Sequence, residues 1–504
     1  MQQNIEQPDT EQPGVEHDRQ LTRRQQRKSG KAAALLWRWY RILRLTLLHW
    51  YAQLRKYAQP TIVIIGQIKN YRHTDYALLL IASITGVLIG LFTVVFHRVL
   101  ELAEQLFHTV FLAAETIAPV RLLVFPLIPA LGGLAVGMLN QTVFRGVGGV
   151  GLLTVARALA FSDGKLHWRH SLRAILTAAF SIGSGGGAGR EGPSVLLGAS
   201  IGSTLGQIFQ LSPEQLRILC GSGTAAAISA IFNAPLGGIV FALEAIMGEV
   251  EIRSFVPLVV ASVLATATTR LFVGNNPLLI SPDLGIPDFS EYILLAIAGM
   301  LSGFVALYFL IAYRKVFRAI YRFLLPIPFV WRPAIGGLLA GILVVFLPTM
   351  LETTYEPINQ AISGKGILWI AALSVLAKPI SNAITLGSGG AGGTMAPALK
   401  TGALFGFCLG SIIQLVLPET QPGFYALVCA AAVLAGTFQI PLAGGIILFE
   451  ISGNYDLILP LLFSSVFASF IVQRFNVRTF NPIQEKITRR SVTPFTIPKE
   501  LLKE

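Results

Sequence analysis

A glycine-rich turn that leads into a proline occurs twice in the chain, and its residue types suit anion binding. Residues 183–206 read GSGGGAGREGPSVLLGASIGSTLG, and residues 387–410 read GSGGAGGTMAPALKTGALFGFCLG. Because proline is favoured in the first turn of a helix, we predict helices that begin at Arg190–Pro193 and Thr394–Pro397. The unpaired N–H groups of a helix start carry partial positive charge and bind anions, most strongly where water is excluded.

One difference between the two copies concerns charge. Arg190 and Glu191 are ionisable, whereas Thr394 and Met395 at the matching positions are neutral. A carboxylate at a helix start can occupy the site that an anion would use, so Glu191 is a candidate gate that opens when the carboxylate is protonated or moves aside. Two simpler interpretations remain: Glu191 forms a buried ion pair with Arg190, or the glycines only permit close helix packing.

The internal repeat extends beyond these turns. At an offset of 206, residues 225–244 (AAAISAIFNAPLGGIVFALE) align with residues 431–450 (AAVLAGTFQIPLAGGIILFE). Glu244 recurs in this way as Glu450, which indicates capping or pairing at a helix end. We therefore expect two homologous halves within this domain order: a cytoplasmic N-terminal segment with an amphipathic membrane-surface helix (1–75), a first half (76–275), a connector (276–287), a second half (288–475) and a short cytoplasmic tail (476–504).

The elements that position these turns must lie in a membrane. Of 504 residues, 53% are hydrophobic and only 13% are charged, against about 25% charged in soluble proteins, which excludes an ordinary soluble enzyme. Nine charge-free stretches have at least 18 residues: 76–96, 122–144, 192–213, 218–243, 292–313, 333–351, 379–399, 401–418 and 420–449. About 20 apolar residues span a bilayer. The predicted fold is an all-α polytopic membrane protein whose duplicated halves bring broken helices together near the midplane, as in transporters and channels.

The net charge of +13 comes largely from the two ends of the chain. Thirteen Lys and Arg precede residue 76 and seven follow residue 473, out of 39, which the positive-inside rule explains with both termini cytoplasmic. We expect a multi-pass protein of the cell (inner) membrane, with no cleavable signal peptide, no nucleic-acid partner and no cofactor. Cys220, Cys408 and Cys429 are isolated, so they predict neither a disulfide nor a metal site.

At the two turns the chain resembles the CLC family of chloride channels and chloride/proton antiporters, over about residues 76–475. Residues 189–193 are identical to the family's GREGP motif, and residues 393–397 fit its G-x-F-x-P motif with Met395 in place of Phe. The resemblance implies that Glu191 is the gating glutamate and that the backbone amides of Thr394 and Met395 coordinate the central anion. It also implies that the Tyr455 hydroxyl completes this site.

Three further features follow from the resemblance. Val147, beside Gly148, stands at the family's central serine and has no hydroxyl, so we expect weak discrimination between chloride, bromide and nitrate. Ala245 stands at the position of a proton-carrying glutamate, so we expect passive chloride transport or weakly coupled exchange. Proton-coupled antiport and fluoride export are the alternatives. A prokaryotic-type homodimer without C-terminal CBS domains is implied. Lys400, after the second turn, either extends toward the membrane surface, which is the more usual behaviour of such a side chain, or raises the local anion concentration.

Overall fold

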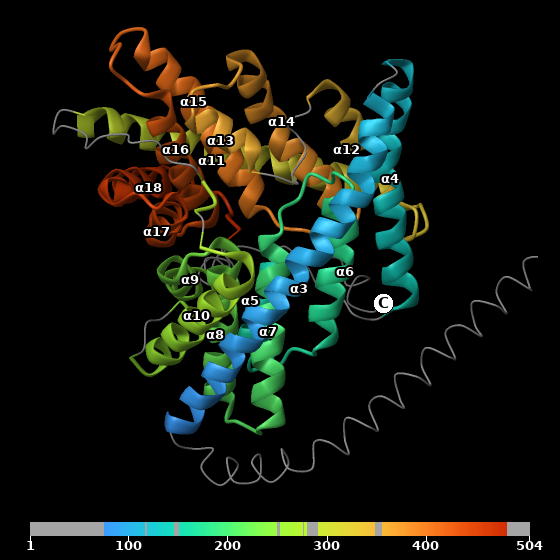
Figure 1. The fold of residues 1–504 in the computed structure, drawn as a ribbon, viewed down its shortest axis with the longest axis vertical. Helices are drawn as coiled ribbons and strands as arrows, with labels where there is room; N and C mark the ends of the chain where they lie inside the picture. The colour runs from blue at the N-terminus through green and yellow to red at the C-terminus, as the bar shows by residue number, and fades with distance from the viewer. Residues whose placement is uncertain are drawn as a thin grey trace, which may run out of the picture. The chain divides into compact units, whose positions relative to one another are not determined.

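The computed structural model describes residues 75–115, 118–145, 151–248, 252–275, 277–279, 291–347 and 355–480, and this part of the chain is nearly all helical (Figure 1). The expected surface helix of the N-terminal segment and most of the connector lie outside it. The elements in chain order are α3 (Asp75–Glu115), α4 (Ala118–Thr142), α5 (Gly151–Phe161), α6 (Arg169–Gly183), α7 (Glu191–Ile208), α8 (Pro213–Phe232), α9 (Pro235–Phe241), η1 (Ala242–Met247), α10 (Ile252–Val273), α11 (Glu291–Leu324), α12 (Arg332–Phe346), α13 (Glu356–Ile362), α14 (Leu368–Gly387), α15 (Met395–Gln414), α16 (Pro422–Phe438), α17 (Pro441–Ser452), η3 (Tyr455–Leu457) and α18 (Ile458–Arg474).

Eight of the described helices are long and apolar enough to cross a membrane: α3, α4, α8, α10, α11, α14, α15 and, together with η3, α18. They confirm the multi-pass membrane fold. The charge-free stretches do not map one to one onto these helices. The stretch 420–449 is divided into α16 and α17, because Gln439 has a left-handed φ of 54° and Pro441 starts a new helix. Such broken helices are typical of transport proteins.

Equivalent small residues bring the two halves together where α4 crosses α12. A Cβ atom on Gly133 would meet the Pro333 carbonyl, and a Cβ atom on Gly337 would meet the Pro129 carbonyl. Gly337 lies 204 positions after Gly133, and Pro333 lies 204 positions after Pro129. This reciprocity is what two homologous halves related by an approximate two-fold axis produce. The glycines are required because the two backbones touch.

The repeated glutamates cap helices reciprocally across the two halves. The Glu450 carboxylate accepts hydrogen bonds from the N–H groups of Leu236 and Gly237 at the start of α9, at 3.1 and 2.7 Å. The Glu244 carboxylate accepts the equivalent hydrogen bonds from the start of α17, at 3.1 and 2.8 Å. The prediction that these glutamates cap helices is confirmed, and each of them caps a helix of the opposite half.

Replacing either glutamate by glutamine is expected to lower the thermal stability of the protein. Glu450→Gln removes the negative charge and one of two acceptors from the start of α9, and losing a helix N-cap costs about 1 kcal/mol. Thermal unfolding in detergent measures the loss of stability. We expect Glu244→Gln to lower the unfolding temperature in the same way and the double variant to lower it further. Glu214→Gln on the exposed start of α8 is the control. An unchanged unfolding temperature in both single variants would contradict the capping role.

Candidate anion site

The two glycine-rich turns have the same backbone. Gly185 after α6 and Gly389 after α14 both have φ near 97°, a conformation that other residues rarely adopt. Each glycine follows a serine, Ser184 or Ser388, that terminates the preceding helix. The repeated Gly-Ser-Gly-Gly sequence is therefore needed to reverse the chain before the next helix begins.

Hydrogen bonds between the halves hold the two turns side by side. The Gly187 N–H donates to Thr385 Oγ1 at 3.0 Å, and the Asn382 amide donates to the carbonyls of Gly187 and Gly393 at 2.8 and 3.1 Å. Gly189 and Gly393 exchange two backbone hydrogen bonds at 2.9 and 2.6 Å. Because Gly189 immediately precedes Arg190 and Gly393 immediately precedes Thr394, the starts of α7 and α15 are next to each other, as predicted.

The start of α15 offers several backbone donors, and Glu191 takes one of them. The first N–H groups of a helix have no acceptor within it, so Thr394, Met395 and Ala396 present what we call the α15 amide site. Glu191 is fully buried, and its Oε2 accepts a hydrogen bond from the Ala396 N–H at 3.3 Å. The carboxylate of one half thus lies on the helix start of the other half. The observed donor is one residue further along than the amides that the resemblance implied.

Tyr355, which sequence reasoning missed, contacts both residues of the charged pair. Its hydroxyl donates to Glu191 Oε1 at 3.3 Å, and the Arg190 guanidinium carbon lies 5.0 Å from the centre of its ring. Arg190 and Glu191 are adjacent, and adjacent side chains on a helix do not face each other. Arg190 therefore faces the tyrosine ring, an arrangement that a cation–π interaction stabilises.

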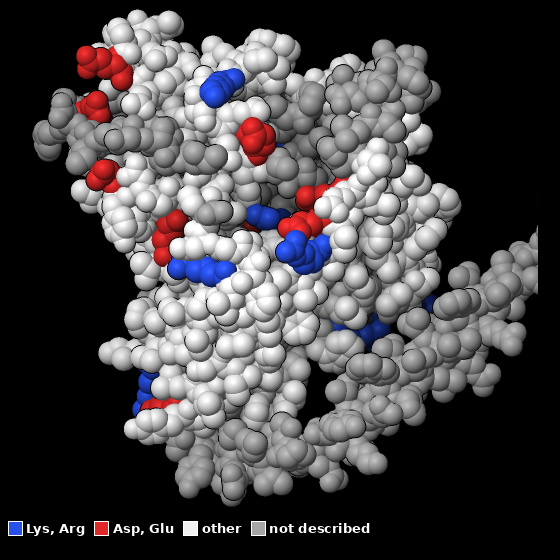
Figure 2. Space-filling view, viewed as in Figure 1, with Lys and Arg blue, Asp and Glu red and all other residues white. Residues whose placement is uncertain are grey.

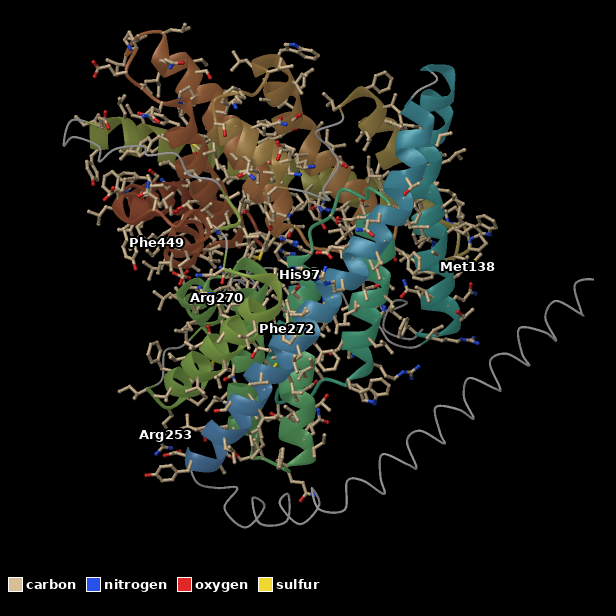
Figure 3. The ribbon with its side chains drawn as sticks, viewed as in Figure 1. His97, Met138, Arg253, Arg270, Phe272 and Phe449 are labelled. Atoms are coloured by element: carbon tan, nitrogen blue, oxygen red, sulfur yellow. The ribbon has the colours of Figure 1, made fainter. Side chains whose placement is uncertain are left out.

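Two residues of α3 lie within electrostatic reach of Arg190. They are His97 and Glu104, one on each side of the exposed Arg98–Glu101 salt bridge of 2.9 Å. Figure 3 shows His97 on α3 near the middle of the view. Figure 2 shows that charges are sparse on this face and that side chains of both signs gather in a hollow near its middle.

Of the other predicted site residues, Tyr455 and Ala245 lie in the part of the chain that the structure describes. Tyr455 is 79% exposed, and the centre of its ring lies 4.9 Å from that of Phe449, a residue labelled in Figure 3. Val147 and Gly148 lie outside the described residues. Ala245 is fully buried within η1, a π-helix, and such segments are frequent at functional sites.

The expectation that Lys400 reaches the membrane surface is wrong. Its side chain is only 1% exposed, and that of Lys378 on α14 is fully buried. Lys400 lies inside because α15 packs between α14 and α16, which leaves its side chain no short path outward. Among the residues that the structure describes, no group of three His, Cys, Asp or Glu is arranged to hold a metal ion.

The fold and the sequence together define the class of protein. The family model for voltage gated chloride channels matches residues 132–473, and the chain belongs to this family, whose members carry chloride and other anions across membranes as channels or transporters and are not enzymes. The chain is 31% identical over 404 residues to the voltage-gated ClC-type chloride channel ClcB of Escherichia coli, covering 78% of this chain and 95% of that protein.

Two solved structures share the fold. One is a slow cyanobacterial Cl⁻/H⁺ antiporter, with a TM-score of 0.73 and 23% identity, covering 83% of this chain and 99% of that one. The other is a CLC-type fluoride/proton antiporter, with a TM-score of 0.68 and 22% identity, covering 81% and 98%.

Proposed function

We propose that this protein moves chloride and similar monovalent anions through a pore that Glu191 gates. The buried Glu191 carboxylate on the Ala396 amide supports this proposal, because its oxygen lies where an anion would meet the α15 amide site. An anion and the carboxylate compete for the same donors. Protonation removes the negative charge of Glu191, and the neutral side chain then yields the site to chloride.

In the proposed mechanism, backbone amides and one arginine attract the anion. Thr394, Met395 and Ala396 supply donors at the positive end of α15, in surroundings where the low dielectric strengthens their effect. Arg190, held over Tyr355, adds a full positive charge close to the gate. Val147, Gly148 and Tyr455 remain predicted lining residues. The mechanism needs no cofactor.

Weak or absent proton coupling is part of the proposal. Ala245 is buried at the position where the family resemblance places a proton glutamate, and alanine cannot carry a proton. The alternative is proton-coupled antiport, which the two antiporters of similar fold favour. Fluoride transport is a further alternative function, since one of these structures is described as a fluoride/proton antiporter.

Purified protein in liposomes separates these alternatives. With an outward chloride gradient and a potassium ionophore, we expect chloride efflux with little proton movement on an internal pH indicator. Chloride-driven proton movement at a fixed ratio, abolished by Glu191→Gln, would contradict weak coupling and establish antiport. Replacing chloride by nitrate or fluoride in the same vesicles measures selectivity, and efflux of fluoride alone would contradict chloride transport.

The proposed assembly is a homodimer with one pore in each subunit, in the cell (inner) membrane with both termini cytoplasmic. The family resemblance supports the dimer, and the 20 of 39 basic residues near the two ends of the chain support the orientation. Particle mass in detergent and labelling of cysteines introduced at each terminus test these two statements separately.

A further inference from the structure

Tyr355 joins the two charged residues at the start of α7 although it lies 164 positions away from Glu191 in the sequence. It immediately precedes the short helix α13, which packs against α15 and α16. Its hydroxyl reaches one carboxylate oxygen of Glu191, and the Ala396 N–H reaches the other. The carboxylate is therefore held at both oxygens by donors from two different elements of the second half.

We propose that Tyr355 is the positioning residue of the gate: its hydroxyl holds the ionised Glu191 on the α15 amide site, and Arg190 fixes the tyrosine ring in place. This inference rests on the proposed function of Glu191. It assigns to Tyr355 control over how readily the gate leaves the anion site, while the amides themselves bind the anion.

The hydrogen-bond chemistry sets the direction of the effect. A phenol, with an ordinary pKa near 10, remains protonated and acts as a donor at neutral pH. A donor to the charged form of an acid favours that form, so the tyrosine hydroxyl favours the ionised carboxylate over the protonated one. Without it, the carboxylate takes up a proton at higher pH and the anion site becomes free at higher pH.

Other ionisable groups lie near this contact. Glu191, Glu104 and Tyr355 all act electrostatically on Arg190, and Arg190 acts on His97. Replacing Tyr355 by phenylalanine retains the ring beneath the guanidinium, but it also removes the hydrogen bond between the Tyr355 side chain and Arg190. The variant therefore removes the hydroxyl contacts to both Glu191 and Arg190, and comparison with the Glu191→Gln background separates an effect through Glu191 from one through Arg190.

The test is the pH dependence of chloride efflux from liposomes that contain the full chain. For Tyr355→Phe we expect the pH of half-maximal efflux to rise by about one unit, which is a tenfold change in proton affinity. We also expect the efflux at low pH to equal that of the wild type, because the α15 amide site is intact. Tyr308→Phe is a matched control, since the Tyr308 hydroxyl donates at 2.7 Å to the Leu376 carbonyl, outside the site.

The double variant Tyr355→Phe/Glu191→Gln distinguishes this inference from the proposed function. If Glu191 is the gate and Tyr355 acts through it, the double variant matches Glu191→Gln alone. An unchanged or lowered half-maximal pH in Tyr355→Phe, or an efflux reduced equally at every pH, overturns the role of Tyr355 while leaving Glu191 as the gate. If the efflux of Glu191→Gln titrates like the wild type, the proposed gate fails and this inference fails with it.

Discussion

Glu191→Gln is expected to raise chloride efflux at neutral pH and to abolish its response to pH. Glutamine has nearly the shape of glutamate but no charge, so it competes with chloride for the Ala396 N–H far more weakly than a carboxylate does. In the wild type, efflux should rise as the pH falls, because protonation neutralises the competing carboxylate. The variant should resemble the wild type at low pH over the whole range.

Efflux from liposomes at a series of pH values measures this. Glu101→Gln is a suitable control, because Glu101 is an exposed carboxylate on α3 whose partner is Arg98 at 2.9 Å. It should leave both the rate and the pH profile unchanged. If Glu191→Gln shows the rate and pH profile of the wild type, Glu191 has no part in gating.

Gly393→Ala is expected to abolish most of the anion flux. A Cβ atom at this position would lie 2.7 Å from the Gly192 nitrogen and 3.1 Å from the Gly192 Cα atom. Both are backbone atoms that no side-chain rotation can move away. The starts of α7 and α15 would have to separate, which breaks the paired hydrogen bonds of Gly189 and Gly393 and withdraws the α15 amide site from Glu191.

Gly206→Ala on α7 is the matched control for this substitution. A Cβ atom there would meet only the methyl ends of leucine side chains, the nearest being Leu216 Cδ1 at 2.5 Å, and these can rotate away. Thermal unfolding in detergent shows whether each variant is folded, and liposome efflux then compares them. A folded Gly393→Ala protein with normal flux would refute the requirement for close contact between the two helix starts.

The sequence predicts the helix starts well because their chemistry is local. Prolines near the starts of α7 and α15 and left-handed glycines at 185 and 389 specify each turn independently of the rest of the protein. The repeat adds the expectation that the two turns are equivalent, and Glu244 and Glu450 indicate the caps. The ungapped offsets of 204 and 206 are strong signals for this reason.

Features that depend on distant contacts could not be predicted in this way. Tyr355 follows no periodic pattern and meets Glu191 only through the packing of α13 on α15 and α16. Lys400 is buried by neighbouring helices that its own sequence context does not reveal. Tyr455 was placed by motif, and its role in anion binding stays a prediction; the Asn454 side chain beside it accepts a hydrogen bond from the Asp456 N–H at 3.0 Å.

The exchange of caps between Glu244 and Glu450 has a consequence for how the molecule assembles in a bilayer. A single half on its own would lack the carboxylate that accepts from two backbone N–H groups at the start of α9 or of α17. The two halves therefore fold as one cooperative unit, because each half caps a helix of the other. Because both halves lie on one polypeptide, the two reciprocal caps form within a single molecule.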